Sequence, residues 1–106
     1  MGKRGRYRYR FDERVALRDV EDLLSLATLA TESLHGRSQV RLDASFLVDA
    51  ESRSCVVDAT TAVGQDIARI FTGFLGRDLG EEAFRVERVT DHSEDEDQKA
   101  SLAGVG

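Results

Sequence analysis

Few residues in this chain have a thiol or an imidazole, the side chains that act most readily as nucleophile and base and that bind metals through sulfur or nitrogen. Cys55 is the single cysteine, and His35 and His92 are the two histidines. They lie far apart in the sequence, with no C-x-x-C pair and no two histidines at helical spacing, so no metal site is predicted. Cys55 with His35 is the one pair worth naming as nucleophile and base. Cys55 falls in the inward phase of a predicted strand, where a substrate would have little access.

We therefore predict no catalytic residue, no cofactor and no enzymatic activity. The favoured function is a small non-enzymatic interaction module that self-associates through one face of its sheet. A small enzyme of unknown reaction is the second alternative to it, and a concave pocket lined with titratable groups would favour this alternative. The sequence predicts no such pocket.

The segment DATTAVGQD, residues 58–66, joins a predicted strand to a predicted helix. Backbone N–H groups at such a helix start can hold a phosphate. This segment has no glycine-rich loop and no following lysine, and it puts Asp66 in the first turn, where an anion would have to sit. Capping of the helix by Thr60 or Thr61 is the favoured interpretation.

Arginines alternate with aromatic residues in the stretch RYRYRF, residues 6–11. Strict alternation predicts a half-buried strand with the aromatic side chains on one face and the arginines on the other. RNA-binding domains stack bases on aromatic side chains of an open sheet face. Turning Tyr7 and Tyr9 outward here would bury three arginines under the helices, which costs several kcal/mol for each. We therefore expect the aromatic side chains in the core.

A nucleic-acid or anion-binding module is the first alternative to a self-associating interaction module. It would use the basic residues at the start of the chain, which are Lys3, Arg4, Arg6, Arg8 and Arg10.

The composition predicts one small folded domain. The chain has 106 residues, a hydrophobic fraction of 41% and a net charge of −5, which as an average opposes a protein devoted to nucleic acid. Residues 1–18 hold seven basic and two acidic residues, whereas residues 91–99 hold five acidic residues and one lysine. Thirteen of the fifteen basic residues are arginine, a bias that favours a GC-rich bacterial source. A lone cysteine and the absence of an apolar run long enough to cross a membrane predict a cytoplasmic protein.

The apolar periodicity predicts four strands and two helices. The strands cover residues 6–11, 38–49, 54–60 and 83–89. The first helix is expected to be capped by Asp12 and to end near His35, with Gly36 as its stop. The second is expected to run from Thr60 or Thr61 to Gly76 or Gly80. Gly73 inside it indicates close packing on Ala27 and Ala30, a hinge, or an end of the helix one turn early.

The order β-α-β-β-α-β with one apolar face on each strand predicts a ferredoxin-like α+β sandwich. In it a four-stranded antiparallel sheet carries two helices on one face. Residues 1–89 form the domain, and residues 90–106 are predicted to be a disordered acidic tail. The other face of the sheet is the predicted partner-binding surface, and a homodimer or another protein is the expected partner, with no membrane contact. Its residues are Arg6, Arg8, Arg10, Arg41, Leu47, Val56, Asp58, Arg85 and Glu87. A solvated face, on which the charged side chains pair with one another across the strands, is the alternative for the same residues.

Overall fold

The computed structural model describes residues 5–89 as a mixed α+β fold with a four-stranded antiparallel sheet and three helices. The strands are β1 (Arg6–Phe11), β2 (Phe46–Asp49), β3 (Ser54–Asp58) and β4 (Phe84–Val89), and the sheet order is β2-β3-β1-β4. The helices are α1 (Leu17–His35), α2 (Arg37–Asp43) and α3 (Ala62–Asp78), and a 3-10 turn, η1 (Glu81–Ala83), precedes β4. The predicted disordered tail at residues 90–106 lies outside the described residues.

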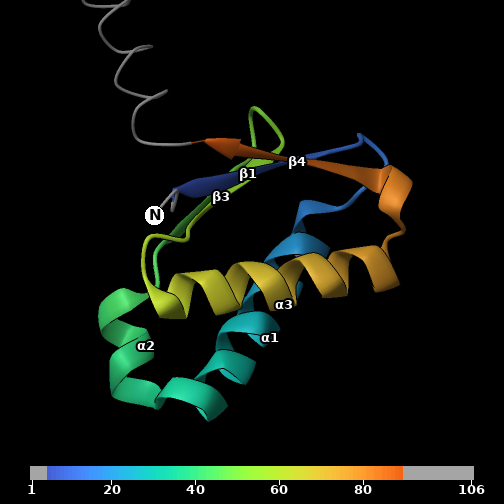
Figure 1. The fold of residues 1–106 in the computed structure, drawn as a ribbon. Coiled ribbons are helices and arrows are strands. Elements are labelled where there is room, and N and C mark those ends of the chain that lie inside the picture. The colour runs from blue at the N-terminus through green and yellow to red at the C-terminus, as the bar shows by residue number, and fades with distance from the viewer. Residues whose placement is uncertain (1–4, 90–106) are drawn as a thin grey trace, which may run out of the picture.

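All three helices lie on the same side of the sheet (Figure 1). Tyr9 and Phe11 of β1 point toward the helices and are buried, as the alternation predicts. The ring of Tyr9 packs edge-on against Phe71 of α3, with the ring centroids 4.9 Å apart. Buried apolar side chains of α1 and α3, including Leu24, Ile67 and Leu75, complete the core between the two layers.

The predicted strand over residues 38–49 is wrong in its first half, which forms helix α2. Alternation of apolar residues places Val40 and Leu42 in one inward phase, but Val40 is buried and Leu42 is 79% exposed. The side-chain amide of Gln39 donates a hydrogen bond to Asp43 one turn on, at 2.7 Å, which suits a helix and not a strand. The fold therefore has three helices where two were predicted.

The helix ends agree with the sequence except at the start of α1. Asp12 does not cap this helix; its carboxylate accepts a hydrogen bond from the backbone N–H of Arg14 at 3.0 Å, and α1 begins five residues later. Gly36 ends α1 with a φ of 90°. Thr61 caps α3, because its hydroxyl oxygen accepts a hydrogen bond from the N–H of Gly64 at 3.0 Å.

Candidate functional site

The strand register places three rows of side chains on the sheet face turned away from the helices. We call this side the open face. The middle row runs across all four strands as Leu47, Val56, Arg8 and Glu87. One flanking row holds Asp49, Ser54, Arg10 and Arg85, and the other holds Asp58, Arg6 and Val89. Side chains of alternate residues share a face of a strand, so these rows follow directly from the pairing.

Ion pairs link the two strands of the basic half of this face. Glu87 of β4 contacts Arg10 at 3.1 Å and Arg8 at 3.7 Å. All three side chains are substantially exposed, so each pair contributes less than about 1 kcal/mol. These ion pairs fix the positions of the side chains on the open face but contribute little to the stability of the fold.

Charge is divided between the two halves of the open face. The half formed by β2 and β3 carries two carboxylates, Asp49 and Asp58, together with Leu47 and Val56. Leu47 is 69% exposed, although contact with water contributes no stability for an apolar side chain. The half formed by β1 and β4 carries four guanidinium groups and one carboxylate; its residues are Arg6, Arg8, Arg10, Arg85 and Glu87.

The two carboxylates of the acidic half also hold the turns next to their strands. Asp49 accepts a hydrogen bond from the backbone N–H of Glu51 at 3.0 Å. Asp58 accepts one from the backbone N–H of Thr60 at 2.8 Å. An Asn at either position would keep an acceptor for these bonds while removing the charge.

Eight of the nine residues predicted for the partner-binding surface lie on the open face. The exception is Arg41, which belongs to α2 because residues 37–43 are helical, and which lies by a shallow cavity with Thr28 and Glu32 of α1.

The candidate nucleophile and base are kept apart by the fold. Cys55 is completely buried in the core, and burial raises the pKa of its thiol to about 12. The ring of His35 forms a hydrogen bond of 2.7 Å with the carboxylate of Asp66, which joins the end of α1 to the second turn of α3; the first turn of α3 holds no acidic residue, contrary to the sequence prediction for Asp66. Within residues 5–89, no three His, Cys, Asp or Glu side chains gather in a way that could hold a metal ion. His92 lies outside the described residues.

The sequence predicted no concave pocket lined with titratable groups, and the structure contradicts this. Tyrosines and arginines are the titratable groups of the pocket, and its described lining holds no cysteine, histidine or carboxylate that could act as nucleophile or base. A cavity of about 500 Å³ lies between α3 and the helix-facing side of β1 and β4. The side chains around it include Tyr7 and Tyr9 of β1, Thr72 of α3, and Val86 and Arg88 of β4. Val86 of β4, the edge strand of the sheet, is 41% exposed although its strand phase faces the helices.

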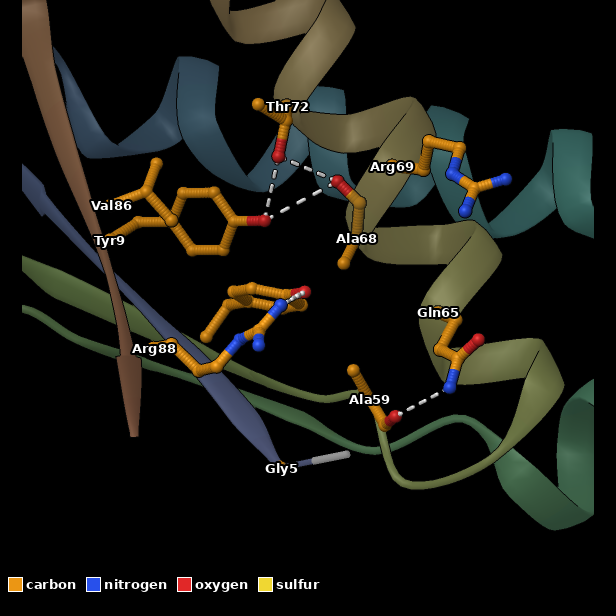
Figure 2. Close-up of a pocket in the computed structure, with 10 residues that line it drawn as sticks. Gly5, Tyr9, Ala59, Gln65, Ala68, Arg69, Thr72, Val86 and Arg88 are labelled. Carbon is orange, nitrogen blue, oxygen red and sulfur yellow. Dashed lines mark hydrogen bonds between the residues drawn. The ribbon is translucent and has the colours of Figure 1, made fainter. Parts of the chain in front are cut away.

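Hydroxyl groups meet at the inner end of this cavity. The Tyr9 hydroxyl lies 2.8 Å from Thr72 Oγ1 and 3.3 Å from the carbonyl oxygen of Ala68, to which Thr72 also donates at 2.7 Å. Figure 2 shows the Tyr9 hydroxyl directed toward Thr72 and Ala68. Burial raises the pKa of Tyr9 to about 12, so this phenol stays protonated at neutral pH.

A cationic group stands at another side of the cavity. The guanidinium of Arg88 lies 5.5 Å from the centre of the Tyr7 ring and donates a hydrogen bond of 3.1 Å to its hydroxyl. The sequence carries one signal for this group, because Arg88 shares its strand phase with Phe84 and Val86, which face the helices. An arginine in that phase marks a position where the helix layer does not close over the sheet.

Comparison with protein-family models, with curated proteins and with solved structures finds no significant match for this chain. No helix within residues 5–89 is both long and apolar enough to cross a membrane.

Proposed function

We propose that the protein is a non-enzymatic interaction module that self-associates through the open face of its sheet. The division of charge across that face carries the proposal. A two-fold symmetric dimer needs a surface that complements itself, because the same patch is used by both copies. A face with one acidic and one basic half meets this requirement when one copy is turned about an axis that runs along the strands between β1 and β3.

Most facing positions of the open face fit such a dimer; the exception is Leu47, which would lie opposite the partner's Glu87. Rotation about this axis keeps each row opposite the same row of the partner and exchanges the two halves. Asp58 would then lie opposite the partner's Arg6, and Asp49 opposite the partner's Arg85. In the middle row, Val56 would lie on the aliphatic stem of the partner's Arg8, as arginine stems cover apolar surface. The strands of two stacked sheets differ in direction by up to about 30°, so the facing pairs near the axis would be aligned best.

We further propose that the fold is of the ferredoxin-like type. The sheet order β2-β3-β1-β4 and the antiparallel pairing of every neighbour support this, since β1 is central and each helical connection spans one strand. Helix α2 would be an addition to the connection between α1 and β2. A cytoplasmic location remains a prediction, and the free, buried thiol of Cys55 is consistent with it.

The nucleic-acid alternative is less favoured by the side chains of the open face. Tyr9 is fully buried, and Tyr7 faces the helices, so neither can stack a base on that face. Titration of the intact chain with single-stranded RNA at low and high salt tests this alternative. Binding that falls steeply with salt would favour it over self-association.

Sedimentation of the full chain over micromolar to submillimolar concentrations tests self-association. We expect a rise from 11.7 kDa toward twice that mass, with a dissociation constant that increases with salt. A constant mass of 11.7 kDa at all concentrations would contradict the proposal.

Charge reversal identifies the surface. Arg85→Glu puts a carboxylate opposite the partner's Asp49 and should weaken the dimer by about tenfold or more. The monomer tolerates the change, because residue 85 pairs in register with Arg10. Asp49→Asn in the Arg85→Glu background removes the repulsion and should restore part of the affinity. Arg77→Glu, an equal charge change on exposed α3, is the control, and an equal effect of both reversals would exclude this face.

A further inference from the structure

The cavity between α3 and β4 has a cationic side and an apolar wall. Arg88 of β4 lines it, whereas the guanidinium of Arg69 on α3 is directed away from Tyr9 and Arg88 (Figure 2), and none of the described residues around the cavity is acidic. Val86, Ala59 and Ala68 supply the apolar wall. Its volume of about 500 Å³ lies in the range of small-molecule sites. A cavity of this kind favours an anion that has an apolar body.

The Tyr7 hydroxyl is arranged to donate into the cavity. It accepts a hydrogen bond from Arg88, so its own proton remains for another acceptor. Together, the Tyr7 O–H and the remaining N–H groups of Arg88 form a set of donors that suits a carboxylate. The Tyr7 ring holds the guanidinium in place, which lowers the entropy cost of binding.

The inner end of the cavity does not suit an anion. The Thr72 hydroxyl donates to the Ala68 carbonyl, and the Tyr9 proton is directed to Thr72 Oγ1 or to the same carbonyl. Both protons are therefore used within the protein, and only oxygen lone pairs face this end. A charged group is thus directed to Arg88, and the rest of the ligand to the apolar wall.

We propose that this cavity binds a small aromatic monocarboxylate, with its carboxylate on Arg88 and Tyr7 and its ring against Val86 and Ala68. An aromatic ring suits the site, because it supplies a flat apolar body for the contacts with Val86 and Ala68. The site is independent of the proposed dimer, since Tyr7 and Arg88 lie on the side of the sheet opposite Arg8 and Glu87.

Titration of the full chain with benzoate, followed by amide chemical shifts in NMR, tests the proposal. We expect saturable binding in the millimolar range or tighter, with the largest shifts in β4 and α3. Benzamide has the same ring without the charge and should bind at least about tenfold more weakly. Acetate has the charge without the ring and should also bind more weakly, because the apolar wall contributes nothing to it.

Two variants locate the site. Arg88→Gln should weaken benzoate binding by about tenfold or more while leaving the weak binding of benzamide unchanged. Val86→Phe fills the cavity from an exposed edge position and should weaken the binding of both. Arg77→Gln loses the same charge outside the cavity and serves as the control, with unchanged affinity.

Equal affinity for benzoate and benzamide would overturn the carboxylate assignment. Absence of saturable binding, or benzoate binding that Arg88→Gln and Val86→Phe both leave unchanged, would overturn the site. None of these outcomes bears on self-association, which Arg85→Glu tests separately.

Discussion

The backbone of Gly64 in the first turn of α3 packs directly against the carbonyl oxygen of Asp58 at the end of β3. A Cβ atom on residue 64 would overlap with that oxygen, and it would also approach the Cα atom of Ala59 to 3.2 Å. Both neighbours are backbone atoms, which cannot move aside as a flexible side chain can. This contact sets how closely α3 follows β3, and thereby the position of α3 above the sheet.

Gly64→Ala is expected to destabilise the protein by several kcal/mol, because the turn between β3 and α3 must open to admit the methyl group. Gly73→Ala in the same helix is the matched control. It is exposed and has no atom within 4 Å of its Cβ position, so it should stabilise the protein by about 0.5–1 kcal/mol. Urea unfolding measures both changes. Similar values for the two variants would contradict the assigned contact.

These two glycines illustrate what the sequence could not predict. Glycine at position 73 indicated close packing or a hinge, whereas the structure places it on an exposed, uninterrupted part of α3. Gly64 gave no sequence signal beyond its place near a helix start. Which helical glycine contacts another segment depends on the packing of α3 on the strands, and that is a long-range property.

Arg53 connects the turn between β2 and β3 to the loop between β1 and α1. Its guanidinium donates to the carbonyl oxygen of Asp12 at 2.9 Å and to that of Val15, and its backbone has a φ of 51°. Arg53→Ala should therefore destabilise the protein by about 1–3 kcal/mol through loss of both bonds. Arg53→Gly loses the same bonds but relieves the left-handed backbone, so it should be about 1 kcal/mol more stable than Arg53→Ala.

Chemical denaturation of the two Arg53 variants beside the wild type provides the measurement. If Arg53→Gly were as stable as the wild type or more stable, the stability that the two side-chain hydrogen bonds contribute would be no greater than the cost of the left-handed backbone at residue 53.

Alkaline pH should destabilise the fold through Tyr9 and Cys55. Burial raises the pKa of Tyr9 from 10.0 to about 12, and that of Cys55 from 9.0 to about 12. Between these values the folded state holds more protons than the unfolded state, so stability falls as pH rises from about 9 toward 12. Each group contributes on the order of 1 kcal/mol per pH unit across its own window.

Urea unfolding at about pH 8 and about pH 11 tests this for the wild type, Tyr9→Phe and Cys55→Ala. Each variant is less stable than the wild type at the lower pH but should lose less stability on going to the higher pH. An equal loss in all three proteins would mean that neither group is responsible.

Much of the fold could be predicted because strands bury alternate residues. The phase of β1 correctly places Tyr9 and Phe11 in the core, and the phases of β3 and β4 correctly place Val56 and Glu87 on the open face. The cavity could not be predicted, because it depends on contacts such as that of Tyr9 with Thr72, 63 positions apart. A strand phase defines which side a residue faces but not whether a helix covers it.

The wrong strand prediction over residues 38–43 yields a direct test of helix α2. Val40 and Ala44 are four residues apart, a spacing that fits one face of a helix as well as alternate positions of a strand. Leu42 is the residue that distinguishes the two structures, since a strand would bury it with Val40, whereas helix α2 leaves it 79% exposed. Leu42→Gln should therefore change the free energy of unfolding by less than about 0.5 kcal/mol. Val40→Ala, at a buried position, should lower it by about 1–3 kcal/mol, and comparable losses from both substitutions would favour the strand.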